Sequence, residues 1–177
     1  HALAKLPVEH TFLDYPPNSM KFNEMINIEW DENTGILITC EDLDLETATD
    51  IAFPVQHAYM LVTTPEENGV YSNGVLNFKK ELCLDVINNI NKKIHTVSRS
   101  DEIDLISWIK ENKLKKIVTL STPVGYVNDY INSKKNEMRD CSVELIKVFR
   151  EYDMKFWNFA NKGFFNFFQK AKTKIAN

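Results

Sequence analysis

The sequence predicts a three-layer, Rossmann-like α/β fold, with about five mostly parallel strands and helices on both faces of the sheet. Two observations lead to this prediction. Short apolar runs of strand length alternate along the chain with longer segments of helical periodicity. In addition, the run 117–120 carries no charge and leads directly into a loop with a proline and a glycine, which is typical of a buried parallel strand.

Five segments have the apolar, β-branched composition of strands. They are 35–39, 57–63, 94–97, 116–120 and 143–149. Apolar and polar residues alternate in the latter half of the last segment, which predicts an edge strand. Because helical segments separate most of these strands, the connections favour a parallel sheet.

Four segments are predicted to be helical, at 75–92, 100–113, 124–139 and about 161–175. The first has an apolar stripe for packing on a sheet, made of Val75, Phe78, Leu82, Val86 and Ile90, with Cys83 and Ile87 on the same side. The second is expected to begin at Ser100 as its N-cap, because the acidic residues that follow complement the helix dipole.

The chain is predicted to consist of an N-terminal arm or linker, 1–33, and an α/β domain, 34–177, which ends in a Phe-rich helical segment (154–177). Prolines interrupt the arm, and Trp30 is expected to anchor it to the domain. One short helical turn is expected between 47 and 54, where a proline stops it. Such arms often connect to another part of a protein, and the chain starts with His, so we expect either a fragment of a longer protein or a tag remnant.

The net charge of −4 is unevenly distributed. Segment 154–177 has five Lys and no acidic residue, so the remainder of the chain carries −9. An acidic body does not attract nucleic acid through its general charge, and only the tail has the charge to do so. No apolar run reaches membrane-spanning length and no signal peptide is recognisable, which predicts a cytoplasmic protein without a membrane partner.

No catalytic residue and no metal site is predicted. The cysteines Cys40, Cys83 and Cys141 are widely spaced, match no metal-ligand pattern and are expected to be reduced thiols of an intracellular protein. The sequence contains no nucleophile elbow and neither glycine-rich nucleotide fingerprint. His57 and His95 lie in or beside predicted strands, without a catalytic or metal partner nearby in sequence, so structural roles are expected for both.

Two loops at predicted strand ends are candidate ligand sites, because open α/β sheets bind ligands there. The first contains Glu41, Asp42 and Asp44, whose carboxylates could hold Mg²⁺ or act as acid and base; the alternative is a solvated acidic loop. The second consists of Ser121, Thr122, Pro123, Val124 and Gly125. It could present backbone N–H groups to an anion or carbonyl, and the alternative is a tight connection fixed by its proline.

The Phe-rich segment has an aromatic face. Its members are Phe164, Phe167, Phe168, Ala171 and Ile175, and most of the lysines fall elsewhere. So many large aromatic rings are expected to be buried against another surface. Three covers are considered: the sheet of the same domain, a neighbouring domain or partner, and a membrane or nucleic acid.

Two stretches together resemble a known family. They are 116–125, a strand ending in a Pro-Val-Gly turn, and 157–168, a tryptophan followed by a Lys-Gly-Phe-Phe-x-Phe helix. In this order they resemble the Rossmann-like α/β domain of photolyase-related, FAD-binding bacterial proteins. The acidic stretch 41–45 is also similar to the stretch after the first strand of photolyase antenna domains, although Asp44 stands where those domains have an arginine.

The resemblance implies an α/β accessory domain of a two-domain photolyase- or cryptochrome-like flavoprotein, active in DNA photorepair or light sensing. In such a protein, a helical domain binds FAD and damaged DNA, and a chromophore can serve as an antenna. The parent would be a deoxyribodipyrimidine photolyase-like lyase, whereas this chain would be non-catalytic, hold no FAD itself and meet DNA only through its parent. The implied contacts with the helical domain are Trp157, Lys162, Gly163, Phe164, Phe165 and Phe168.

Two further interpretations come from the residues alone. The chain could be a free-standing α/β enzyme, or a protein that binds a small ligand or nucleotide, using the strand-end loops. It could also be an interaction module that binds a partner through its Phe-rich C-terminal helix.

Overall fold

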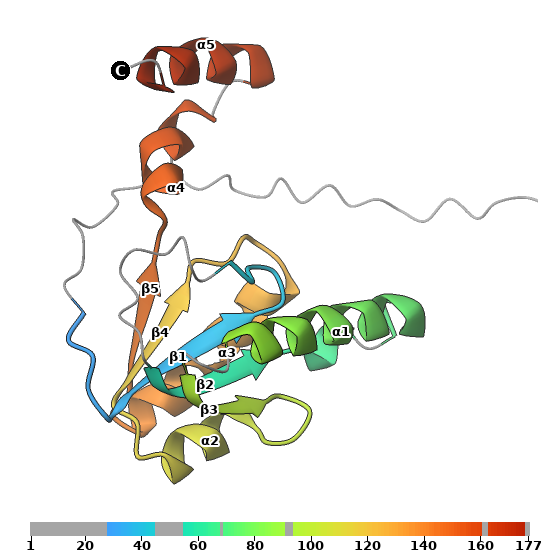
Figure 1. Ribbon diagram of the computed structural model, residues 1–177, viewed down its shortest axis with the longest axis vertical. Coiled ribbons are helices and arrows are strands. Elements are labelled where there is room, and N and C mark those ends of the chain that lie inside the picture. Colours follow the sequence, from blue (N-terminus) through green and yellow to red (C-terminus); the bar gives the residue numbers. More distant parts are fainter. Residues whose placement is uncertain (1–27, 45–54, 68, 91–93, 161–162, 176–177) are drawn as a thin grey trace, which may run out of the picture. The chain divides into compact units, whose positions relative to one another are not determined.

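The computed structural model describes residues 28–44, 55–67, 69–90, 94–160 and 163–175 (Figure 1). The strands are β1 (Thr34–Thr39), β2 (Val55–Leu61), β3 (Ile94–Arg99), β4 (Lys116–Leu120) and β5 (Glu144–Val148). The helices are α1 (Asn73–Ile90), α2 (Leu105–Glu111), α3 (Tyr126–Asp140), α4 (Glu151–Phe156) and α5 (Phe164–Ile175). Single 3₁₀ turns lie at Pro65–Glu67 and Trp157–Phe159.

The strands form one parallel sheet with the order β3-β2-β1-β4-β5. Ile36 in the central strand β1 lies opposite Ala58 of β2 and Val118 of β4. All six residues of β1 are buried, as expected for a strand covered on both faces. The predicted Rossmann-like α/β fold is therefore confirmed, and β5 is an edge strand as its alternating pattern predicted.

Helix α1 covers one face of the sheet. There, Ile36 and Ile38 point into the cluster that also contains Cys83 of α1. The half-buried Ile28 and Trp30 pack against the same cluster, which confirms the prediction that Trp30 anchors the segment before β1. Because both side chains are only half-buried, each contributes less than the roughly 1.5–3 kcal/mol of a fully buried apolar side chain.

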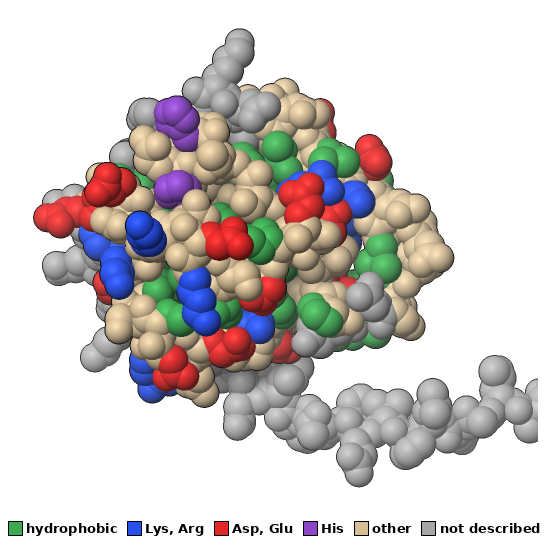
Figure 2. Space-filling model, turned by 90° about the horizontal axis from the view of Figure 1, so that it is seen from below, with side chains coloured by type: hydrophobic (Ala, Val, Ile, Leu, Met, Phe, Trp, Pro, Cys, Tyr) green, Lys and Arg blue, Asp and Glu red, His purple; other side chains and the backbone are tan. Residues whose placement is uncertain are grey.

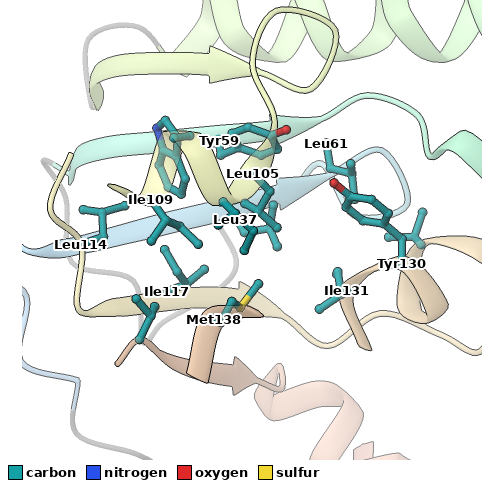
Figure 3. Packing of buried hydrophobic residues seen from close by; sticks show 14 residues of the cluster. Leu37, Tyr59, Leu61, Leu105, Ile109, Leu114, Ile117, Tyr130, Ile131 and Met138 are labelled. Atoms are coloured by element: carbon teal, nitrogen blue, oxygen red, sulfur yellow. The ribbon is translucent and has the colours of Figure 1, made fainter. Parts of the chain in front are cut away.

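Helices α2 and α3 cover the opposite face, and Figure 3 shows this second cluster from close by. Leu37 points into it from β1, one residue out of step with Ile36, as the strand period of two requires. The close approach of α2 depends on Gly35. A Cβ atom at this position would lie 2.7 Å from Cη2 of Trp108 and 2.8 Å from Cδ1 of Leu114, and both side chains are buried.

The chain divides into two compact units. Of the described residues, those within 28–153 make up the unit with the sheet, and those within 154–175 belong to the other unit. In the described part of the second unit, the Phe156 ring lies edge-on to the rings of Phe159 and Phe167, at centroid distances of 6.3 and 6.5 Å. Phe164 and Phe168 stack at 5.9 Å. Aromatic packing thus gives this unit a small internal contact set of its own.

The predicted stripe of α1 is confirmed in its second half and wrong in its first half. Cys83 is buried and Val86 and Ile87 are half-buried against the sheet, whereas Val75, Phe78 and Leu82 are exposed, Phe78 by 64%. The sequence contains two adjacent apolar rows on this helix, and only one of them can face the sheet. Periodicity alone does not decide between the two rows.

Helices α2, α4 and α5 differ most from the prediction. Helix α2 begins after Asp104, whose Oδ2 accepts a hydrogen bond from the Ser107 backbone N–H at 3.0 Å, so Ser100 is not the N-cap. Helix α4 lies between the predicted strand 143–149 and the predicted helix that starts at about 161, where no separate helix was predicted. Helix α5 begins only at Phe164, because Gly163 has a positive φ of 82°, which is incompatible with a helix. The predictions for 1–27, for the turn at 47–54 and for Lys162 lie outside the described residues.

Candidate binding site at the carboxyl edge of the sheet

The two predicted loops meet at the carboxyl edge of the sheet, because β1 and β4 are neighbours in the sheet. After β1 the chain turns tightly, and the backbone N–H of Asp42 donates to the carbonyl of Thr39 at 3.1 Å. This turn directs Glu41 toward the start of α3, where a Cβ atom on Gly125 would lie 3.9 Å from Oε1 of Glu41. The position between these strands, where the connections change direction, is the usual ligand position in such sheets.

Asp42 is engaged by an arginine that sequence reasoning missed. Nη1 and Nη2 of Arg150, just after β5, donate to its two carboxylate oxygens, the latter at 2.5 Å. Nη2 also donates to the main-chain carbonyl of Asp44 at 2.5 Å. The hydrogen bond to Asp42, above all, raises the pKa of Arg150. Asp42 therefore holds the loop after β1 in place. Of the predicted carboxylates, Glu41 is the one that lies near the start of α3.

The second loop is fixed at its beginning and exposed at its end. The backbone N–H of Ser121 donates to the carbonyl of Val148 at 2.8 Å, and Thr122 is buried beside Asn128. Pro123 and Val124 are exposed. Gly125 is the N-cap of α3 and has no side chain to cap the helix, so the first N–H groups of α3 lack the usual side-chain acceptor at that position.

A partly buried ion pair lies near Glu41. Glu67 is only 2% exposed; its Oε2 accepts from the Thr64 backbone N–H at 2.6 Å and its Oε1 pairs with Nζ of Lys79. Burial, above all, raises the pKa of Glu41. The charge of Lys79 opposes this shift, and the charge of Glu67 adds to it. Burial raises the pKa of the neighbouring Cys40 thiol as well. Sequence reasoning missed this cluster, because its members come from two loops and α1.

A cavity of about 500 Å³ opens at the same edge on the side of α3. Its lining includes Tyr59, Thr64, Asp101, Glu102, Asp104 and Lys134, which come from β2, the segments after β2 and β3, and α3. This volume is within the range of small-molecule sites. Sequence reasoning missed the cavity, since none of these segments carries a recognisable motif and only the sheet order brings them together.

The predicted contact residues of the second unit are exposed. Phe164, Phe165 and Phe168 are 68%, 81% and 52% exposed, and Trp157 is 44% exposed. Gly163 supplies the positive φ that precedes α5. The helix therefore presents a surface of large rings next to the lysines of its last turn.

Several predicted absences can be examined in the described part of the chain. Within it, no group of three His, Cys, Asp or Glu side chains is arranged to hold a metal ion. The three cysteines, all of them described, form no disulfide. Among the described helices, none combines the length and hydrophobicity that a bilayer-crossing segment requires. On the face shown in Figure 2, acidic and basic side chains are interspersed, without a large field of one sign.

Two comparisons with known proteins found no relative. No protein-family model matches the chain, and no curated protein matches it.

Proposed function

We propose that this chain is the non-catalytic α/β accessory domain of a cytoplasmic, photolyase-like flavoprotein used in DNA photorepair or light sensing. The observation that carries the proposal is the exposure of Phe164, Phe165 and Phe168, the rings of the Lys-Gly-Phe-Phe-x-Phe motif. Rings of this size are covered in most folded proteins. In the proposal, the cover is the helical FAD-binding domain of the same protein, which also makes the contacts with DNA.

The fold supports this proposal. A five-stranded parallel sheet with helices on both faces is the architecture that the resemblance to photolyase α/β domains implies. The engagement of Asp42 by Arg150 also fits a supporting role, since this carboxylate is used to fix a loop. FAD is expected in the parent protein, and this chain is assigned neither FAD nor an antenna chromophore.

The test uses the full-length gene product that contains this chain. We expect it to be purified with bound flavin, visible in its absorption spectrum. Changing Phe165 and Phe168 to Ala together should lower the amount of flavin retained per polypeptide, because the contact between α5 and the helical FAD-binding domain would be weakened. Phe78→Ala, an exposed ring on α1 outside the motif, is the matched control and should retain the flavin. A colourless full-length protein would contradict the proposal. The remaining interpretation of the Phe-rich helix would then be an interaction module that binds a separate partner.

A second candidate function is small-ligand binding between the loops after β1 and β4. The observation that favours it is the position of Glu41 beside Gly125, at the uncapped start of α3. A ligand with both a donor group and an acceptor group could bind the carboxylate and the helix N–H groups together. Asp44, exposed in the same loop, stays a candidate ligand residue in this proposal.

Nuclear magnetic resonance titration of the chain with adenosine diphosphate, adenosine and simple amino alcohols tests the second candidate. A ligand of this site should shift the amide signals of 125–128 and lose about tenfold in affinity in Glu41→Gln, which removes one charged hydrogen bond. Glu144→Gln, at the opposite end of the sheet, is the control. Equal affinities of the two variants would rule out a role for Glu41.

A further inference from the structure

The first turn of α1 contains an Asn-Gly pair, Asn73 and Gly74, at an exposed helix start. Ser72 occupies the N-cap position before it. The Ser72 carbonyl accepts from the Leu76 backbone N–H at 3.1 Å, and Oγ of Ser72 accepts from the Val75 backbone N–H at 3.4 Å. The pair therefore lies where a helix has no main-chain acceptor for its own N–H groups.

The backbone N–H of Gly74 and the carboxamide of Asn73 are both open to reaction. In the described part of the chain, neither group has a hydrogen-bond partner. A Cβ atom on Gly74 would have a single neighbour within 4 Å, Oγ of Ser72 at 3.8 Å. The Gly74 nitrogen is therefore unshielded on that side, and the neighbouring Asn73 carboxamide is not held by another group.

Other described asparagines are more restrained. Nδ2 of Asn112 donates to the carbonyl of Trp108 at 2.9 Å, and Nδ2 of Asn89 donates to Asp85 at 3.2 Å. Among the described asparagines, Asn73 is the one followed by glycine. The sequence contains a second Asn-Gly pair at 68–69, but Asn68 lies outside the described residues. An experiment on Asn73 must therefore distinguish it from Asn68.

The helical conformation limits the reaction between the two groups. Closure of a ring between the Gly74 nitrogen and Cγ of Asn73 requires a ψ angle at Asn73 outside the helical range, so the first turn has to open. Opening breaks the two hydrogen bonds to Ser72. It uncovers little apolar surface, because residues 72–75 are all exposed. Exposed helix ends with few buried contacts open at low cost in free energy.

We propose that Asn73 is a site of spontaneous deamidation, at a rate set by the opening of the first turn of α1. The Gly74 nitrogen forms a bond to Cγ of Asn73 while the Cγ–Nδ2 bond breaks, and Nδ2 leaves as ammonia with the proton of the Gly74 N–H. Water then opens the cyclic imide at either carbonyl, which gives aspartate or isoaspartate. The inference does not depend on a flavin-containing parent, because every residue it uses is in this chain.

The two products affect α1 in opposite directions. Aspartate at the first helical position places a negative charge at the positive end of the helix dipole, which stabilises the helix. Isoaspartate routes the main chain through the former side chain and lengthens it by one methylene group, so the cap formed by Ser72 no longer fits. The preceding Tyr71 lies edge-on to Tyr126 of α3, with ring centroids 6.1 Å apart. Isoaspartate should therefore also loosen this contact between the starts of α1 and α3.

The test is incubation of the chain at mildly alkaline pH, followed by cleavage after Tyr71 and mass spectrometry. This cleavage places Asn68 and Asn73 in different peptides. The peptide that starts at Ser72 should change from the mass of the amide to that of the acid and separate into aspartate and isoaspartate forms. Asn73→Gln is the control and should keep its amide. An intact Asn73 in the folded chain, after the same time has converted Asn73 of the urea-unfolded chain, would overturn the proposal.

Variants of the neighbouring residues test the dependence on the first turn. Ser72→Ala removes the cap and should speed the conversion of Asn73 about fivefold, whereas Ser72→Thr retains a capping hydroxyl and should leave the rate almost unchanged. Gly74→Ala should slow the conversion about two- to fivefold through the greater stability of the helix alone, and further by crowding the nitrogen. Equal rates in Ser72→Ala and the original chain would show that opening of this turn does not set the rate.

Discussion

Single residues decide the shape of the carboxyl edge, and Gly125 is the sharpest case. Its φ of 155° and ψ of −173° lie in a region open almost only to glycine. Steric contact is not the constraint, since a Cβ atom there would have no neighbour closer than Glu41 at 3.9 Å. The sequence placed a loop here from its proline and glycine, but the particular backbone angles follow from the packing of α3 and could not be predicted.

Replacing Gly125 with Ala should lower the free energy of unfolding by about 1–3 kcal/mol, because the new residue would be held in a strained backbone conformation. Urea unfolding followed by circular dichroism measures the change. Gly74→Ala is the control, in which the free energy of unfolding should change in the opposite direction. Gly74 lies within α1 and has room for a methyl group, so Ala should stabilise the helix by about 0.5–1 kcal/mol. Equal stability of Gly125→Ala and the original chain would show that the loop relaxes freely.

At the scale of elements, ion pairs tie helices to the loops of the sheet. Asp101, after β3, is held by Arg99 of β3 and Lys80 of α1. Hydrogen bonds from Arg99, above all, hold the pKa of Asp101 well below its usual value. The folded state therefore binds the proton more weakly than the unfolded chain, in which the pKa is about 3.9. The resulting stabilisation is present above about pH 4 and is lost as the pH falls below that value.

Asp101→Asn should therefore destabilise the chain at pH 7 and narrow the difference in stability between pH 7 and pH 3. Denaturant unfolding at the two pH values measures both effects. Glu111→Gln, at an exposed position of α2, is the control and should change neither. If Asp101→Asn kept the full difference between the two pH values, the acid sensitivity would have to come from other carboxylates.

Elements were more predictable than their contacts. The strands were identified because a strand buried on both faces, such as β1, has an almost continuous apolar sequence. The contact face of α1 was predicted too wide, because Phe78 and Leu82 form an apolar row next to that of Cys83 and Val86, and only the latter two pack against the sheet. Periodicity shows that a helix is amphipathic, whereas the choice between two adjacent rows depends on the position of the helix over the sheet.

At the scale of the whole molecule, the candidate site depends on pairs that sequence cannot show. Arg150 and Asp42 are 108 positions apart, and the strand order alone brings them together. The cavity likewise combines β2, the segment after β3, and α3. The fold class follows from local patterns, but the order of the strands comes from the competition between complete packings. The proximity of Glu41 to Gly125 was predictable only in so far as both follow strands of one parallel sheet.

The position of Arg150 also has a mechanical consequence. Its guanidinium group grips the loop after β1 only three residues before the division between the two compact units. A pull transmitted along the backbone from the Phe-rich segment would meet this grip before it reached the hydrogen bonds between β4 and β5. The hydrogen bonds of β5 are therefore the second contact, and not the first, that such a pull would load.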